Sequence, residues 1–362
     1  MKPTRALHEL GQSLWLDNIT RDLLDSGTLE RYCRELSITG LTSNPSIFDE
    51  AIAKGSSYGN AITSLASRGL GTEDIFMSLA LEDLRRAADL FRPVFDSTHG
   101  VDGWVSMEVS PLLASDTAGS VAAAEAIHAR AGRPNLFVKI PGTPQGVPAI
   151  EEAIFRGIPV NVTLLFSKDQ YIASQQAYVR GIERRIAAGR PPVVASVASV
   201  FVSRWDRAVA DKVPAELHNR LGLAVGQLCY VAYREYLDSE RWRRLAQAGA
   251  QSQRLLWAST GVKDPAAPPA LYIEGLAAPD TINTIPDKTL LAFDQVGRVG
   301  STLQPDESTA RATLARFRAA GVDIDALATR LQVDGAAAFV KSWNDLLKRI
   351  ADRSGASPAP AT

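Results

Sequence analysis

The stretch "NLFVKIPGTPQG", residues 135–146, places a charged side chain inside a segment that otherwise has the composition of a buried strand. Apolar residues lead into Lys139, and an isoleucine, a proline and a glycine follow it. A lysine is rarely buried unless it is paired or has a chemical task. The sequence therefore raises two questions: which fold buries this strand, and what the lysine does there.

Similar apolar runs recur along the chain and alternate with patterns typical of helices. We predict strands at residues 13–18, 38–44, 103–111, 136–142, 157–167, 191–203, 254–261 and 270–276. Most of these runs are apolar throughout, which is typical of parallel strands that helices cover on both faces. Eight such units predict an α/β fold, a single (β/α)8 or TIM barrel with an extra C-terminal segment and helices. The alternative is an open doubly wound sheet, but no GxGxxG motif follows the first strand.

Helices are predicted between the strands and after them. They fall at residues 19–36, with Gly27 as a candidate break, and at 73–92, 116–132, 168–188 and 215–248. Beyond residue 287 the alternation stops, and residues 287–303 read as an extended surface segment before helices near 306–320 and 335–351. We expect one barrel domain over residues 1–352, including the C-terminal helices, and a disordered tail at 353–362.

The composition is that of an ordinary globular protein of 362 residues, with a formal net charge of −1 at pH 7. This balance does not favour nucleic acid or an anionic membrane surface as a partner. Cys33 and Cys229 are the only cysteines, and the N-terminus lacks the apolar core of a signal peptide, so we expect a cytoplasmic protein. The four histidines show no metal-ligand spacing, and no metal site is expected.

Polar side chains lie late in the predicted strands, where the active site of such a barrel is built. They are Asp17, Asn44, Glu108, Lys139, Asn161, Thr163, Ser199 and Ser259. Asp17 and Asn44 each have a structural alternative, because either residue can cap the helix that follows. Glu108 and Lys139 can likewise form a purely structural ion pair. Their equivalent positions in successive units favour one shared site over independent caps and bridges.

The combination of residue types indicates a particular chemistry. Burial in an apolar strand disfavours the charged form of a lysine and so lowers its pKa. A neutral amine forms a Schiff base with a carbonyl substrate, and the iminium draws electrons from the neighbouring carbon–carbon bond. Two carboxyl groups can divide the proton transfers between a substrate hydroxyl and the water that leaves the carbinolamine. We therefore interpret Lys139 as a reactive lysine that works with Asp17 and Glu108.

Three segments resemble signature regions of the transaldolase family, the Schiff-base enzymes of the pentose phosphate pathway. They are "LTSNPSIF" (41–48), "VKIPGTPQGVPAIEEAIFRGIPVNVTLLFS" (138–167) and "SVASVFVSRWD" (196–206). The resemblance runs from about Leu14 to about Leu276. It implies that Lys139 is the Schiff-base lysine and that Asp17 is the acid–base group for the hydroxyl beside the cleaved bond. It also implies that Glu108 and Thr163 hold and activate a catalytic water.

The same resemblance implies a substrate-binding set. The residues that would hold the dihydroxyacetone unit are Asn44, Asn161 and Ser199. Arg204 matches a family arginine that holds the substrate phosphate. The shorter family members carry a second phosphate arginine after strand seven, whereas this chain reads "WASTGVKDP" there. Lys263 is the nearest basic residue, and Ser259 offers a hydroxyl, which together with the extra C-terminal segment is similar to the longer bacterial subgroup.

These features lead to three functional hypotheses. The leading one is transfer of a dihydroxyacetone group from sedoheptulose 7-phosphate or fructose 6-phosphate to glyceraldehyde 3-phosphate or erythrose 4-phosphate. The second is an aldolase of the same chemistry that releases free dihydroxyacetone, and the third is a barrel without catalytic activity. No cofactor is expected, because the iminium itself is the electron sink. The partners are sugar phosphates, and the sequence leaves a monomer and a homodimer both open.

Overall fold

The computed structural model describes residues 1–354, and its centre is a sheet of eight parallel strands. The strands are β1 (Ser13–Leu16), β2 (Ile38–Leu41), β3 (Val105–Glu108), β4 (Leu136–Pro141), β5 (Val160–Leu165), β6 (Ser196–Phe201), β7 (Arg254–Ala258) and β8 (Ile282–Ile285). Their order in the sheet is β2-β1-β8-β7-β6-β5-β4-β3. Every strand residue is buried, as expected for strands covered on both faces.

The two end strands of this order, β2 and β3, close the sheet on itself. The Leu41 N–H donates to the Trp104 carbonyl at 2.9 Å, and the Ser43 hydroxyl donates to the Ser106 carbonyl at 2.7 Å. The sheet is therefore a nearly closed barrel, and the predicted (β/α)8 fold is confirmed.

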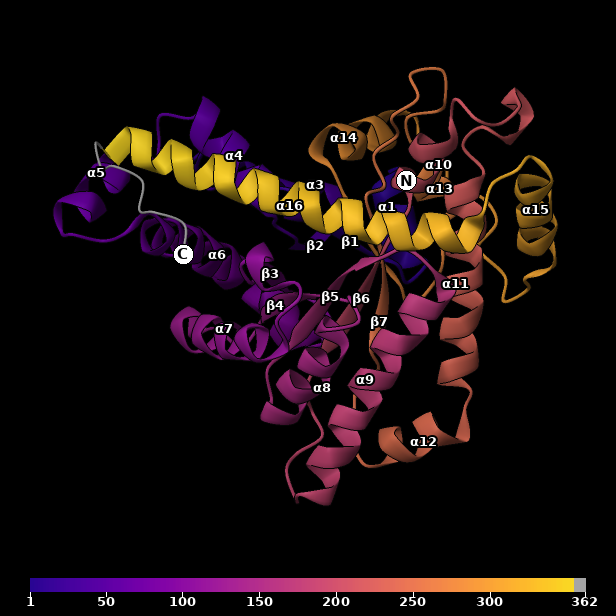
Figure 1. Cartoon of the computed structure of the whole chain (residues 1–362), viewed down its shortest axis with the longest axis horizontal. Coiled ribbons are helices and arrows are strands. Elements are labelled where there is room, and N and C mark those ends of the chain that lie inside the picture. Colours follow the sequence, from indigo (N-terminus) through magenta and orange to yellow (C-terminus); the bar gives the residue numbers. More distant parts are fainter. Residues whose placement is uncertain (355–362) are drawn as a thin grey trace.

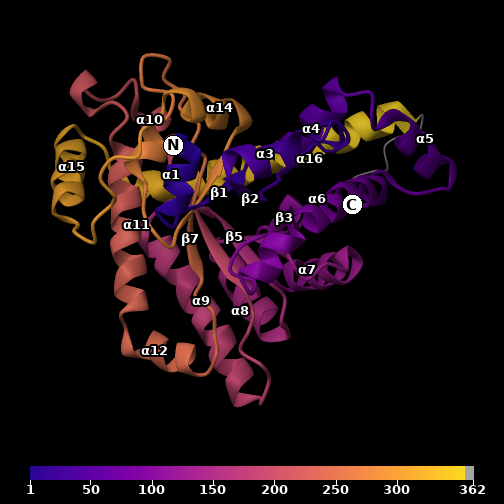
Figure 2. The same cartoon turned by 180° about the vertical axis from the view of Figure 1, so that it is seen from behind.

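Helices surround the barrel (Figures 1 and 2). They are α1 (Pro3–Glu9), α2 (Arg21–Asp25), α3 (Thr28–Leu36), α4 (Pro45–Lys54), α5 (Gly59–Ser67), α6 (Thr72–Ser97), α7 (Thr117–Ala131), α8 (Gly146–Arg156), α9 (Lys168–Ala187), α10 (Ser203–Val209), α11 (Leu221–Leu237), α12 (Glu240–Gln247), α13 (Leu271–Gly275), α14 (Asp287–Val296), α15 (Ser308–Ala319) and α16 (Ile324–Ser354). Gly27 does divide the first predicted helix, because it adopts a left-handed conformation with φ +69° before α3.

The predicted eighth strand, residues 270–276, is wrong. That run forms the short helix α13, and the true strand β8 lies further on, at Ile282–Ile285. A short apolar run does not distinguish a strand from a buried helix. The real strand was hidden because Asn283 and Thr284 interrupt its apolar character. Both side chains are buried all the same, and Thr260 donates a hydrogen bond to the Asn283 side chain at 3.0 Å.

The extended segment predicted at 287–303 is also wrong in its first part. Residues Asp287–Val296 form α14, which begins directly after Pro286 and buries Leu290 and Phe293 on one side. The predicted C-terminal helix at 335–351 is longer than expected, because α16 already begins at Ile324. Arg353 and Ser354 still belong to it, and residues 355–362 of the predicted tail lie outside the described residues.

Helix α16 crosses the end of the barrel at which the strands finish (Figure 1, yellow). It packs against α4, α5, α6 and β5, which lie far from it in the sequence. Buried Gln332 donates from Nε2 to the carbonyls of Gly142 and Leu164, both at 2.9 Å. Because these contacts join the C-terminal helix to the barrel, we continue to propose one domain over residues 1–352.

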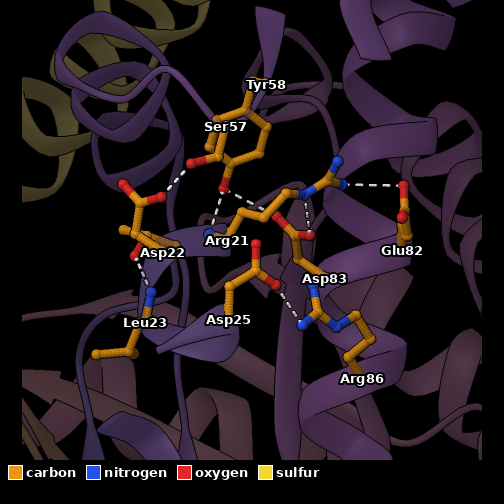
Figure 3. Close-up of polar contacts among 10 residues, drawn as sticks. Arg21, Asp22, Leu23, Asp25, Ser57, Tyr58, Glu82, Asp83 and Arg86 are labelled. Atoms are coloured by element: carbon orange, nitrogen blue, oxygen red, sulfur yellow. Dashed lines mark hydrogen bonds and ion pairs between the residues drawn. The ribbon is translucent and has the colours of Figure 1, made fainter. Parts of the chain in front are cut away.

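A buried polar cluster fixes the N-terminal helices to α6 (Figure 3). Arg21 of α2 donates to Asp83 and to Glu82 of α6, each at 2.9 Å. Tyr58, from the α4–α5 link, donates to the other Asp83 oxygen at 2.8 Å and accepts from the Arg21 backbone at 2.8 Å. The Asp83 side chain is fully buried and that of Arg21 is only 11% exposed. Burial raises the pKa of Asp83, and the Arg21 guanidinium only partly offsets this effect.

We expect Arg21→Met to lower the free energy of unfolding by about 3–5 kcal/mol, because it leaves the Asp83 carboxylate buried without its cation. The double variant Arg21→Met/Asp83→Leu should regain most of that loss, since it removes both charges. Urea unfolding at constant pH measures both effects. A single variant as stable as the double variant would show that the ion pair does not compensate the buried charge.

Candidate active site

A pocket of about 130 Å³ opens at the C-terminal ends of the strands. The sequence-predicted residues that line it are Asp17, Asn44, Lys139, Thr163, Ser199, Arg204, Ser259 and Lys263. Two further predicted residues, Glu108 and Asn161, lie behind this wall and bind its members. The barrel therefore brings the whole predicted set together in one place, as its geometry requires.

Lys139 of β4 sits between two in-register neighbours, Glu108 of β3 and Asn161 of β5. Its Nζ lies 2.8 Å from Glu108 Oε1 and donates to the Ser43 carbonyl at 2.8 Å. The two charged side chains are only 7% and 9% exposed. The lysine is thus not isolated among apolar residues, because a carboxylate and a carbonyl oxygen compensate its charge.

The carboxyl groups of Glu108 and Asp17 both have pKa values above their ordinary range. Burial raises the pKa of Glu108, and the Lys139 ammonium opposes that rise without cancelling it. Burial also raises the pKa of Asp17, against the opposing effects of Lys139 and of a hydrogen bond from the Thr42 hydroxyl at 2.9 Å. Both groups are therefore suited to take up and release protons near the lysine.

Thr163 of β5 presents a hydroxyl that has no hydrogen-bond partner among the described residues. The side chain is 1% exposed and lines the pocket beside Lys139. A buried hydroxyl without a partner is costly unless water or a ligand supplies one. This observation fits the expected water-holding role, which stays a prediction.

Asn161 and Ser199 form a hydrogen-bonded chain rather than two separate ligands. The Ser199 hydroxyl donates to Asn161 Oδ1 at 2.7 Å, and Asn161 Nδ2 donates to Ser106 Oγ at 3.1 Å. Asn161 is fully buried, so only Ser199 of this pair reaches the pocket wall. We expect Asn161 to orient Ser199, and its direct contact with the substrate stays a prediction.

Asn44 combines the two uses that the sequence left open. Its Oδ1 accepts from the Ile47 N–H at 3.0 Å and so caps α4, with Pro45 in the first turn. The residue also lines the pocket, and within residues 1–354 no hydrogen bond engages its Nδ2 group. The cap fixes the side chain and leaves the amide donor available.

Arg204, near the start of α10, supplies one of the positive charges in the pocket lining. Its guanidinium carbon lies 5.1 Å from the ring centre of Phe201 and 5.8 Å from that of Phe339. No carboxylate among the described residues forms an ion pair with it. Burial lowers its pKa, and nearby Arg207 adds to that effect. An arginine remains charged in spite of this shift, so its donors are available to an anion.

The rim near β7 carries the other two predicted phosphate ligands. Lys263 is exposed, lines the pocket, and forms no ion pair within the described part of the chain. Ser259 adopts a left-handed conformation with φ +56°, and its hydroxyl lies 3.0 Å from that of Ser203.

Sequence reasoning missed Thr42, Phe201 and Phe339, which also line the pocket. Thr42 contacts Asp17, and its hydroxyl lies 2.6 Å from that of Thr284. Its position in the segment "LTSNPS" was a signal that could have found it. Phe339 comes from α16, and nothing in the sequence linked that helix to the strand ends.

Over residues 1–354, no group of three or more His, Cys, Asp or Glu side chains is placed to hold a metal ion. None of the helices in that range is both long and apolar enough to cross a membrane.

Comparison with known proteins agrees with the geometry of this site. A sequence model of the transaldolase/fructose-6-phosphate aldolase family matches residues 14–350. The chain belongs to this family. It is 44% identical to a transaldolase of Thermobifida fusca strain YX, over 98% of this chain and 99% of that protein. It is 43% identical to a transaldolase of Parafrankia sp. strain EAN1pec and 44% identical to one of Thiobacillus denitrificans, again over nearly all of each chain.

Membership of the transaldolase family makes the chain an enzyme, and the names of these relatives favour a transferase over a lyase. The pocket at the strand ends, with its lysine and two carboxyl groups, is then the candidate active site. The individual roles of these residues remain proposals.

We expect Asp17→Asn to stabilise the protein increasingly, relative to the unchanged chain, as the pH rises from about 4 to 8. The folded-state pKa of Asp17 lies above its ordinary value of 3.8, so the native state holds this proton longer than the unfolded state. The stability that the Asp17 carboxyl group contributes is therefore fully present below its ordinary pKa, and it is lost as the pH rises through the raised pKa of the folded state. Urea unfolding at several pH values measures the difference between the two chains.

Asp264→Asn is the matched control, because hydrogen bonds from Asn219 and the Ala266 N–H lower the pKa of Asp264. Its carboxylate contributes stability above the ordinary pKa that is lost as the pH falls. The difference between variant and unchanged chain should therefore have the opposite sign. Parallel behaviour of the two variants would contradict the burial of the Asp17 carboxyl.

Proposed function

We propose that the protein is a transaldolase that moves a dihydroxyacetone unit from a ketose phosphate to an aldose phosphate. The donor is sedoheptulose 7-phosphate or fructose 6-phosphate, and the acceptor is glyceraldehyde 3-phosphate or erythrose 4-phosphate. The observation that supports this most directly is the buried Lys139–Glu108 pair at 2.8 Å, which faces a pocket that also contains Asp17. A cytoplasmic location stays our expectation.

The reaction begins with loss of a proton from the lysine. Glu108 is placed to accept it across the 2.8 Å contact, and its raised pKa suits it to hold that proton. The neutral amine then adds to the ketose carbonyl and forms a carbinolamine. Glu108 returns the proton to the departing hydroxyl through a water that the free Thr163 hydroxyl helps to hold, and an iminium remains.

Cleavage follows when Asp17 removes the proton from the hydroxyl beside the bond that breaks. The electrons of that bond pass into the iminium, which becomes an enamine, and the first aldose phosphate leaves. The acceptor aldehyde then takes its place, receives the enamine carbon and takes the proton back from Asp17. Hydrolysis by the reverse of the first steps releases the product ketose and restores the free lysine.

The phosphate is held by Arg204 and, at the rim, by Lys263 with the Ser259 hydroxyl. Arg204 suits this task because its planar donors have no carboxylate partner in the described part of the chain. A lyase that releases dihydroxyacetone is the alternative, and it differs only in admitting water to the enamine before the acceptor arrives.

We expect borohydride reduction in the presence of fructose 6-phosphate to attach the substrate carbon skeleton to Lys139, as mapped by mass spectrometry. Lys139→Arg should give no adduct. Asp17→Ala should still be trapped, since cleavage comes later, whereas Glu108→Ala should form the adduct about a hundredfold or more slowly. An adduct confined to another lysine would overturn the assignment.

We expect Arg204→Ala to reduce the preference for fructose 6-phosphate over free fructose, in kcat/KM, by about ten- to hundredfold, because a charge-assisted hydrogen bond is lost. Lys263→Ala should give a smaller loss, since the exposed ammonium remains partly solvated. The control is Lys212→Ala, which removes an exposed cation shortly after the helix that carries Arg204 and does not line the pocket. If Lys263→Ala keeps the full preference, the second phosphate ligand lies elsewhere.

A further inference from the structure

The inner face of α16 forms part of the wall around Arg204. Gln332, Gly335 and Phe339 follow one another at intervals of three and four residues, so they lie on one side of the helix. Gln332 binds the carbonyls at the ends of β4 and β5, and Phe339 lines the pocket. This face of the helix therefore reaches the substrate pocket itself.

Phe201 and Phe339 hold the guanidinium of Arg204 through their rings, at 5.1 Å and 5.8 Å. Aromatic rings attract the cation but do not use its N–H donors in strong hydrogen bonds. The guanidinium is thus held in place while its donors remain available to an anion. A carboxylate partner would hold it equally well but would compete with the phosphate.

Gly335 lets the helix approach the same side chain. A Cβ atom at this position would lie 2.9 Å from Arg204 Nη1 and 3.0 Å from Leu164 Cδ2. Glycine in a helix interior normally destabilises the helix relative to alanine. Its presence in the middle of a helix of 31 residues is explained by this close approach.

We propose that Gly335 and Phe339 are positioning residues, through which the C-terminal helix holds Arg204 ready for the substrate phosphate. The proposal rests on the proposed function in one respect: it takes the anion in this pocket to be the phosphate of the sugar substrate. It adds that the preference for phosphorylated sugars depends on α16, a helix outside the eight repeated barrel units.

The test measures inorganic phosphate binding by titration calorimetry and, separately, the KM and kcat for fructose 6-phosphate. Phe339→Leu removes the ring but keeps an apolar side chain, and Gly335→Ala pushes on the tip of Arg204. Each should raise the phosphate dissociation constant and the KM by about three- to thirtyfold, with kcat within about twofold. Phe339→Tyr should restore both constants, because it restores the ring face.

Two measurements separate positioning from a general loss of structure. Trp343→Leu loosens α16 elsewhere, where Trp343 packs edge-on against Phe76 at 5.1 Å, and it should leave phosphate binding unchanged. Gly335→Ala should not lower the thermal unfolding midpoint, because alanine is the better helix former and the nearest atom that its Cβ meets is the tip of the Arg204 side chain. Borohydride trapping with dihydroxyacetone, which has no phosphate, should proceed at the same rate in Gly335→Ala and Trp343→Leu, whose positions do not line the pocket.

The proposal is overturned if Phe339→Leu and Gly335→Ala both bind phosphate as tightly as the unchanged chain, or if Trp343→Leu weakens phosphate binding as much as they do. Failure of the proposed function gives a different result. In that case the unchanged chain forms no adduct with dihydroxyacetone, while the phosphate titrations still report on Arg204.

Discussion

The contact between Lys139 and Glu108 is the interaction around which the mouth of the barrel is organised. Two charges on neighbouring parallel strands lie almost entirely out of water, with side-chain exposures of 7% and 9%. Burial of this kind is tolerated only when the charges compensate each other and further hydrogen bonds satisfy them, as the Ser43 carbonyl does for the lysine. Moving one proton across the contact removes both buried charges at once. In the mechanism proposed above, this transfer gives the neutral amine that attacks the substrate carbonyl and leaves a protonated carboxyl group beside it.

The charged side chains at the two ends of the barrel differ in how far the protein itself satisfies them. At the N-terminal ends of the strands, Asp102 accepts hydrogen bonds from Ser13 and from Trp15, and Arg254 donates to Ser13 and to the Thr281 carbonyl. These groups are saturated by the protein, as structural charges usually are. At the C-terminal ends, the Thr163 hydroxyl lacks a partner and Arg204 lacks a carboxylate within the described residues. Unused hydrogen-bonding capacity of this kind is what a polar substrate requires.

Seven of the strands and the cluster of polar residues at their ends could be predicted from the sequence, because both depend on local patterns. Seven apolar runs predicted real strands, and their polar ends converge once a parallel barrel forms. The hydrophobic pattern did not predict β8, because its polar residues Asn283 and Thr284 are buried and hydrogen-bonded. The sequence also left open whether Asn44 caps a helix or lines the pocket, and in the structure it does both. The contact of Arg204 with Phe339 joins distant parts of the chain, and no local pattern records it.

The C-terminal helix links a backbone irregularity to the geometry of the pocket. The pairing of β5 with β6 shifts between Val162 and Leu165, and Leu164 adopts a left-handed conformation with φ +60° directly after Thr163. A non-glycine residue in that region is strained, and its carbonyl needs a partner outside the ladder. Gln332 supplies one. That hydrogen bond brings α16 close to Arg204. One turn later the helix carries Gly335, where a side chain would meet the guanidinium. The next turn places the ring of Phe339 over the same group. One hydrogen bond thus links the strained end of β5 to the position of the Arg204 guanidinium.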